Sequence, residues 1–178
     1  MCLTATVTWA QDVVIDRLVP GRLGITVLQQ VNSFDDVRSL TIRSGKWNDT
    51  DLNLLQNDFP YLRKLDLGGL DSKYFSVGSI YNVSVGRKDS LRTIVLPRNL
   101  VVVPRGIISE CPLVEEIEIP SSVISVTQNA FSNTKLRHVT FHEGLQVLGY
   151  ASFSNCVNLE RVTLPASLIS ASGAFYGC

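Results

Sequence analysis

Carboxylate and imidazole side chains gather near the middle of this 178-residue chain. Glu116 and Glu118 alternate with isoleucines in the segment "VEEIEIP", and His138 and His142 follow in "LRHVTFH". Carboxylates and imidazoles can ligate metal ions, and they are also common general acids and bases. Metal binding and acid–base catalysis are therefore hypotheses, and they depend on where the surrounding elements place these four side chains.

The segment around the glutamates recurs along the chain with apolar residues at its first, fourth and sixth positions and often proline next. Six copies start at Val37, Leu62, Leu91, Val114, Leu136 and Leu159. The intervals between the last four starts are almost equal, whereas the two intervals before Leu91 are longer. Self-similarity at a near-constant period predicts a repeat protein.

Each copy predicts a short strand whose apolar side chains alternate toward a core, followed by a turn at the proline. Stacked about 4.8 Å apart, such strands build a parallel sheet in which each repeat buries the face of the previous one. Later in the unit, a small residue precedes phenylalanine in Ala130-Phe131, Ser152-Phe153 and Ala174-Phe175. We therefore expect a right-handed solenoid that returns along its far side through short strands or 3₁₀ turns.

The region before the repeats predicts an N-terminal cap over residues 11–36, because the end of a solenoid needs a polar-faced cover. Leu23, Val27 and Val31 are spaced as on one face of a short helix. A second helix is expected at "DLNLLQNDF", with Asn48 or Thr50 as its N-cap. Helices are thus expected before Pro60 and strands after it.

The two ends of the chain carry separate expectations. Residues 1–10, "MCLTATVTWA", resemble the tail of a secretory signal peptide that ends at Thr8-Trp9-Ala10, and the alternative is a first strand of the domain. At the other end, Cys178 falls in the middle of a unit. We therefore expect a repeat array over residues 37–178 that is truncated at its C-terminus.

The units resemble leucine-rich repeats of the BspA-like, or Treponema pallidum, type. That type reads C-x-x-L-x-x-V-x-L-P-x-S-L-x-x-I-x-x-x-A-F, and residues 156–175 read "CVNLERVTLPASLISASGAF", with one residue fewer before Ala174. The resemblance implies a leucine-rich repeat solenoid with its parallel sheet on the concave side. It also implies a non-enzymatic, secreted or cell-surface adhesion module of a bacterium, which binds host or bacterial surface and matrix proteins, or glycans. The alternative is a scaffold or targeting segment of a larger exported enzyme or glycan-handling protein.

Strand alternation predicts which polar residues point outward from the sheet. The outward residues proposed to bind a partner are Lys64, Asp66, Glu116, Glu118, His138, Thr140 and Arg161. A second candidate surface is the irregular insertion over residues 68–90, with Tyr74, Phe75 and Tyr81, for which the alternative is inward packing. The sequence around the glutamates and histidines shows no nucleophile motif and no sign of a pocket, so a solvated binding face is favoured over catalysis or a metal, and no cofactor is expected.

Cys111, Cys156 and Cys178 occupy one column of the repeat, which favours a small buried residue over a reactive thiol. Cys111 and Cys156 are two repeats apart, about 10 Å, and this is too far for a disulfide, whereas Cys156 and Cys178 are neighbours that could pair. Paired C-x-x-C spacing, which a thiolate zinc site needs, is missing.

Composition excludes two further classes. Sixteen basic and sixteen acidic residues give a formal net charge of zero, and no Lys/Arg cluster is present to neutralise a row of phosphates, so nucleic acid is not an expected partner. No apolar run approaches the roughly 18 to 20 residues of a membrane-spanning helix. With 45% hydrophobic and 18% charged residues, the chain has the composition of a folded domain.

Overall fold

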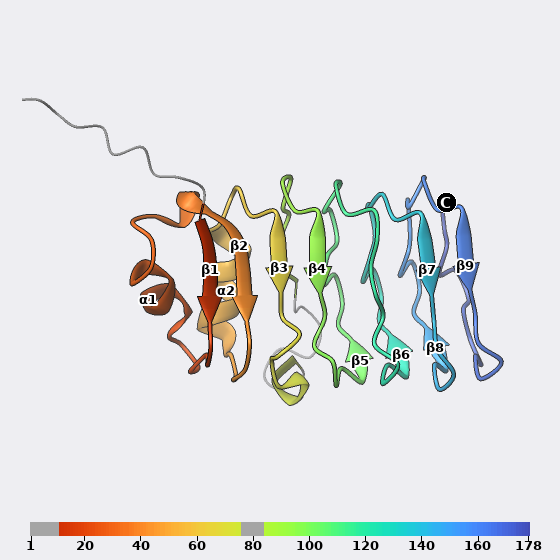
Figure 1. The fold of residues 1–178 in the computed structure, drawn as a ribbon. Helices are drawn as coiled ribbons and strands as arrows, with labels where there is room; N and C mark the ends of the chain where they lie inside the picture. The colour runs from red at the N-terminus through yellow and green to blue at the C-terminus, as the bar shows by residue number, and fades with distance from the viewer. Residues whose placement is uncertain (1–10, 76–83) are drawn as a thin grey trace, which may run out of the picture.

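The computed structural model describes residues 11–75 and 84–178 and shows a row of coils stacked side by side (Figure 1). One side of the row carries a four-stranded parallel sheet in the order β1-β2-β3-β4 and a two-stranded parallel pair, β7-β9. The other side carries a three-stranded sheet in the order β5-β6-β8. The strands are β1 (Gln11–Ile15), β2 (Val37–Ile42), β3 (Lys64–Asp66), β4 (Thr93–Val95), β5 (Val102–Val103), β6 (Ser125–Val126), β7 (His138–Thr140), β8 (Val147–Leu148) and β9 (Arg161–Thr163).

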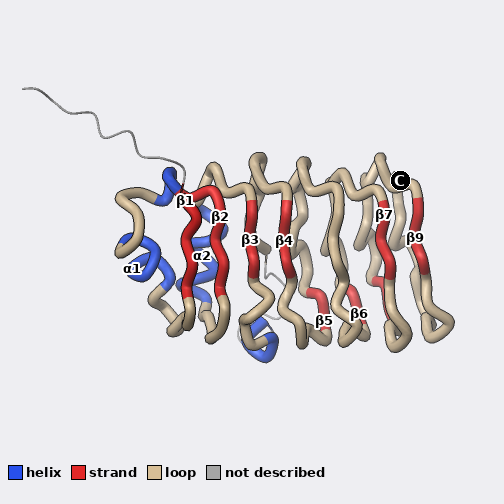
Figure 2. Tube along the Cα trace, viewed as in Figure 1, coloured by secondary structure: helices blue, strands red, loops and turns tan. Residues whose placement is uncertain are grey.

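Most of the helices cluster at the N-terminal end of the row, and one short helix lies below β3, after Pro60, where only strands were expected (Figure 2). The elements are α1 (Leu23–Leu28), the 3₁₀ helix η1 (Phe34–Asp36), α2 (Asp49–Asn57) and the 3₁₀ helix η2 (Ser72–Phe75). Helix α1 ends before Val31 and is therefore shorter than the spacing of Leu23, Val27 and Val31 predicts, although all three residues are buried. Asn48 is the N-cap of α2, and its side chain accepts hydrogen bonds from the backbone amides of Thr50 and Asp51.

The apolar columns of the repeat form one continuous core between the two sides. In the coils from Val37 to Phe141, nearly every column residue is fully buried, and Ile117 is partly buried. The last coil is covered from one side only, so Leu159 and Val162 are partly buried and Leu164 is 45% exposed. Burial in this fold therefore depends on the presence of both neighbouring coils.

The far side of each coil turns twice through left-handed backbone conformations, once before and once after the phenylalanine position. The residues with positive φ are Gly106, Asn129, Ala151 and Gly173 at the first turn, and Glu110, Asn133, Asn155 and Gly177 at the second. Between the two turns, the phenylalanine rings stack along the row, with centroids 4.9 Å apart for Phe131 and Phe153 and 5.4 Å apart for Phe153 and Phe175. The paired turns aim each ring into the core.

The sheet is not continuous along the row, which differs from the uninterrupted parallel sheet that the repeat predicts. Residues 114–119, hereafter the glutamate segment, lie between β4 and β7 and make one isolated bridge, Glu116 to His138 (Figure 2). Within the described residues, no backbone hydrogen bond joins this segment to β4. Glutamate is depleted in strands, so three glutamates in this short segment disfavour regular strand pairing.

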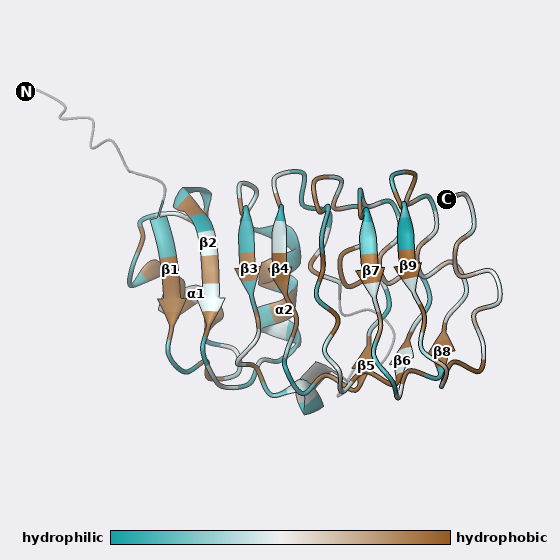
Figure 3. Ribbon diagram, turned by 45° about the vertical axis from the view of Figure 1, so that its right-hand side comes forward, coloured by the Kyte–Doolittle hydropathy of each residue, from teal (hydrophilic) through white to brown (hydrophobic). Residues whose placement is uncertain are grey.

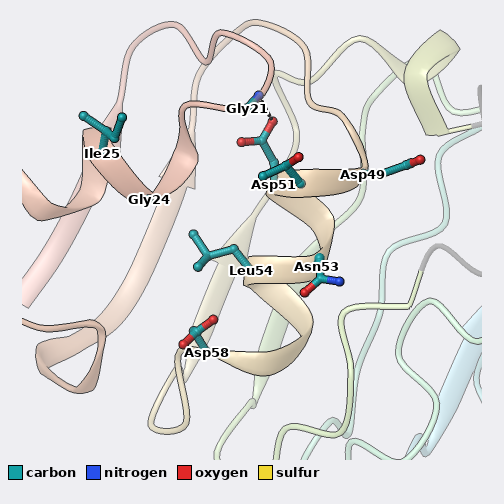
Figure 4. A pocket seen from close by; sticks show the side chains of 9 residues that line it. Gly21, Gly24, Ile25, Asp49, Asp51, Asn53, Leu54 and Asp58 are labelled. Carbon is teal, nitrogen blue, oxygen red and sulfur yellow. Dashed lines mark hydrogen bonds between the residues drawn. The ribbon is translucent and has the colours of Figure 1, made fainter.

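A buried carboxylate fixes the starts of α1 and α2. Asp51 is 1% exposed, and its carboxylate accepts from the backbone amide of Gly21 at 2.6 Å (Figure 4). It also accepts from the backbone amides of Leu23 at 2.8 Å and Asn48 at 3.0 Å. These amides belong to the start of α1 and to the N-cap of α2. Backbone amides at helix starts have no intrahelical partner, so one side chain satisfies the beginnings of both helices.

A buried lysine fixes the other end of α2. Lys88 is 3% exposed, and its ammonium donates to the backbone carbonyls of Gln56 at 3.0 Å and Asp58 at 2.7 Å. Burial lowers the pKa of Lys88, and the negative end of the helix dipole favours its charge. Helix α2 is thereby tied to the coil that contains β4.

Replacing Asp51 by alanine should lower the free energy of unfolding by about 2–3 kcal/mol, because three backbone amides lose a charged acceptor. Urea denaturation followed by circular dichroism measures the loss. Asp49→Ala, an exposed position in the first turn of the same helix, is the matched control and should change stability by less than about 0.5 kcal/mol. Equal effects of the two substitutions would contradict this role of Asp51.

Ser152 is fully buried in the column that holds Ala130 and Ala174, and its hydroxyl has no hydrogen-bond partner. Ser152→Ala should therefore raise the free energy of unfolding by about 1 kcal/mol, because the substitution removes an unsatisfied buried polar group. Ser132→Ala is the opposite case, since the Ser132 hydroxyl bonds to Ser109 at 2.8 Å and should cost about 1 kcal/mol when lost. Denaturation curves of both variants check the two signs.

Candidate functional site

The strand registers align the outward residues of successive coils in rows. Ser39, Lys64 and Thr93 are direct neighbours across β2, β3 and β4. On the other side of the interruption, Glu116, His138 and Arg161 are neighbours through one bridge and the β7-β9 pair. Lys64, Thr93, Glu116, His138 and Arg161 are all exposed. The structure therefore places these residues on one open face of the molecule, hereafter the sheet face.

A second row on the sheet face lies two residues further along each strand. Asp66 is paired with Thr41 and Val95, and Thr140 is paired with Thr163. Glu118 and Thr140 are exposed, whereas Asp66 is partly buried and accepts from the backbone amide of Gly68 at 3.0 Å. Figure 3 shows the hydrophilic character of β7 and β9 in contrast to the hydrophobic β5 and β8. The sheet face is thus polar at most outward positions, and Val14 and Val95 in the second row are its exposed apolar exceptions.

One ion pair with two hydrogen bonds crosses the C-terminal half of the sheet face. The Arg137 guanidinium donates to Glu160 at 2.7 and 3.1 Å, and His138 Nε2 lies 3.9 Å from the same carboxylate. The hydrogen bonds from Arg137 hold the pKa of Glu160 below its usual range and raise the pKa of Arg137. All three side chains are about half exposed, so this group is a solvated surface pair rather than an enclosed acid–base site.

The structure brings together only part of the group that suggested metal or acid–base chemistry. Glu116 and His138 are neighbours, whereas His142 lies in the exposed turn after Phe141. Across residues 11–75 and 84–178, no cluster of three or more His, Cys, Asp or Glu side chains is arranged to hold a metal ion.

A hollow of about 610 Å³ lies between α1 and α2, away from the sheet face (Figure 4). Its lining includes Asp49, Asp51 and Asp58. The carboxylate of Asp51 already accepts backbone hydrogen bonds from the cap. The hollow therefore belongs to the structural contact between the two helices.

The insertion is only partly described. Tyr74 and Phe75 end the short helix η2, and Tyr81 lies outside the described residues. The proposal that these aromatic residues bind a partner therefore stays a prediction. Ser72, at the start of η2, bonds to the backbone carbonyl of Asn99 at 2.8 Å and so attaches the insertion to the coil that contains β4.

The cysteine column is a packing feature in the described residues. Cys111 and Cys156 are buried free thiols, and Cys178 is an exposed free thiol, so Cys156 and Cys178 are not paired. Burial raises the pKa of Cys111 to about 11 and also raises the pKa of Cys156. Thr134 fills the same column in its coil, where its hydroxyl lies 3.2 Å from the Cys156 sulfur.

Sequence reasoning missed a charged column at the edge of the sheet face. It consists of the second residue of each repeat, namely Arg38, Arg63, Arg92, Glu115, Arg137 and Glu160. Backbone bonds such as Arg92 to Arg63 at 2.9 Å and Glu160 to Arg137 at 2.9 Å place successive members side by side. The signal was present in the sequence, because every one of the six copies carries a charge at this position.

Sequence reasoning also missed an exposed apolar edge beside β5, β6 and β8. Val101, Val102, Ile124, Val147 and Ile169 are between 38% and 78% exposed. The backbone amide of Ile124 donates to the carbonyl of Val101 at 2.9 Å, so the edge follows the stacking of the coils. This apolar edge lies across the coil from the sheet face and is a second exposed surface, against which binding by the sheet face can be compared.

Coils that each contribute one strand with apolar residues at positions one, four and six define a leucine-rich repeat protein. The family model "BspA type Leucine rich repeat region (6 copies)" matches residues 75–178, more than half of the chain. The chain belongs to this BspA-type leucine-rich repeat family, as its sequence pattern predicts. Repeats of this family form protein-interaction modules, are typical of surface or exported bacterial proteins, and are generally non-enzymatic.

Among solved structures, the chain is similar to a leucine-rich repeat protein from Bacteroides ovatus. The two share 22% identity with a TM-score of 0.48, and the match covers 64% of this chain and 29% of that one. The chain thus spans less than a third of the length of that protein. None of the curated proteins compared with the chain matches it. No helix within the described residues has the length and apolar character needed to cross a bilayer.

With Cys2 replaced by serine, only Cys178 should react with a thiol reagent in the folded protein near pH 8. Cys111 and Cys156 should react after denaturation, because burial and their raised pKa values keep them as inaccessible thiols. Titration with a chromogenic disulfide in native and denaturing buffer counts the groups. Fast modification of Cys111 in the native protein would show that the column is accessible and not a packing feature.

Proposed function

We propose that this chain is a non-enzymatic binding module of a secreted or cell-surface bacterial protein, and that it binds other proteins through the sheet face. The observation that carries the proposal is the alignment of exposed polar side chains across the sheet, including Lys64, Glu116, His138 and Arg161. An open, polar surface of stacked strands suits a macromolecule better than a small substrate.

The exported location is a proposal supported by two features. Residues 1–10 resemble the end of a signal peptide, and BspA-type repeats are typical of exported or surface proteins. The proposed partners are surface or matrix proteins of a host or of co-resident bacteria, or glycans attached to them. The outward rows mix both charge signs, so recognition is expected to depend on the arrangement of charges and not on net charge.

A binding assay on immobilised extracellular-matrix proteins and on surface proteins of co-resident bacteria tests this function. Lys64→Ala and Glu118→Ala should each weaken binding about 3-fold to 10-fold, because each removes an exposed charge from the contact. Ile124→Ser on the apolar edge is the matched control and should leave binding unchanged. Loss of binding in Ile124→Ser alone would move the site to the apolar edge, and loss in Tyr74→Ala and Tyr81→Ala alone would move it to the insertion.

A further inference from the structure

Residues of opposite charge lie on the two sides of the interruption of the sheet without pairing, and Arg92 and Glu115 share one repeat column across it. On the N-terminal side, Arg63, Lys64 and Arg92 project from the coils of β3 and β4 and are exposed. On the C-terminal side, the glutamate segment exposes Glu115, Glu116 and Glu118. None of these six side chains makes a hydrogen bond or an ion pair with another described residue. The sheet face therefore holds a basic block and an acidic block next to each other.

Comparison with a later pair of coils shows that this arrangement is specific to the interruption. Arg92 and Glu115 occupy the same column of neighbouring repeats, as do Arg137 and Glu160. In the second pair, the backbones are bonded and the side chains form an ion pair at 2.7 Å. In the first pair, neither contact forms. The missing backbone pairing keeps apart two charges that the regular repeat spacing would join.

The interruption is confined to the sheet face. On the far side, β5 and β6 from the same two coils are paired in register, and the backbone amide of Glu110 donates to the backbone carbonyl of Ser132 at 3.0 Å. The two coils are thus held together on the far side. On the sheet face, the backbone groups of β4 and of the glutamate segment that face each other make no hydrogen bond in the described part of the chain. Backbone groups without a hydrogen-bond partner and charged side chains without an ion-pair partner therefore lie together on the sheet face, between β4 and the glutamate segment.

We propose that this place binds an extended polypeptide segment of a partner protein in which an acidic block and a basic block are separated by a short spacer. The acidic block pairs with Arg63, Lys64 and Arg92, and the basic block pairs with the glutamate segment. This inference rests on the proposed function, because it names the chemistry of the partner for the same sheet face.

Strand spacing fixes the distance between the two blocks of the partner. The glutamate segment belongs to the second coil after that of β3, and the β3-β4 and β5-β6 pairings stack these coils at the usual spacing, or roughly 10 Å in total. An extended chain covers roughly 3.3 Å per residue, so a spacer of about three residues spans the interruption. A partner segment in which acidic and basic residues alternate would place charges of the same sign against each block, and this repulsion would prevent it from binding.

Synthetic peptides test the inference directly. The probe carries a block of aspartates, a short Gly-Ser spacer and a block of lysines, and its control has the same composition with alternating charges. Fluorescence anisotropy at low salt should show at least about tenfold tighter binding of the probe, and high salt should remove most of the difference. Equal binding of the two peptides, or no binding of either, overturns the inference.

Charge-reversal variants locate the site. Arg92→Glu and Glu116→Lys should each weaken binding of the probe about tenfold, because each turns an attraction into a repulsion. Arg105→Glu, an exposed position after β5 on the far side, makes the same change in net charge as Arg92→Glu and should leave affinity unchanged. Equal losses in Arg92→Glu and Arg105→Glu would show a response to net charge alone and would also overturn the inference.

The two proposals fail separately. If the module still captures surface proteins through Lys64 and Glu118 while the charge-segregated probe binds no better than its control, only the chemistry of the partner is wrong. If the probe binds as expected but no surface or matrix protein is captured, the sheet face recognises segregated charges and the proposed biological partners are wrong. Circular dichroism of each variant, with a spectrum that overlays the parent protein, ensures that both readings refer to folded protein.

Discussion

Backbone hydrogen bonds between successive coils hold this molecule together, because a single coil cannot bury its own apolar side chains. The bonds run along the far side as well as the sheet face, for example from Phe131 to Ser152 at 2.8 Å and from Phe153 to Ala174 at 2.9 Å. They form because left-handed turns at both ends of the phenylalanine segment present the same amide and carbonyl groups in each coil. The phenylalanine stack follows from this ladder, since equal coils place their rings one above another.

At the N-terminal end of the row the β1-β2 pairing continues this ladder, and two charged side chains add contacts that fix the helices. Asp51 satisfies amides of α1 and the N-cap of α2, and Lys88 satisfies carbonyls at the end of α2. Both side chains are buried, and each bonds to backbone groups distant in the sequence. The transition from helices to regular repeats is therefore fixed by individual polar contacts, whereas the array after it is fixed by periodicity.

This division explains how much could be predicted from the sequence. The strands, the outward rows and the small residue at Cys111 and Cys156 follow from period and alternation, which are visible in one chain. The contacts of Asp51 and Lys88 could not be predicted, because their partners are distant backbone groups with no residue signature. The left-handed turns are an intermediate case, since Asn129, Asn133 and Asn155 mark them but Glu110 and Ala151 do not.

The interruption at the glutamate segment is where local sequence and global repeat disagree. Three glutamates in one short segment oppose pairing with β4, yet Val114 and Ile119 remain in the core and the far-side ladder is intact. Backbone hydrogen bonds join each coil to its neighbour on the sheet face and on the far side, so a coil can lose one set and still stack. The fold therefore tolerates outward residues that would disrupt a protein built on a single sheet. Because such residues are not needed for stacking, the charges exposed at the interruption can change without loss of the core.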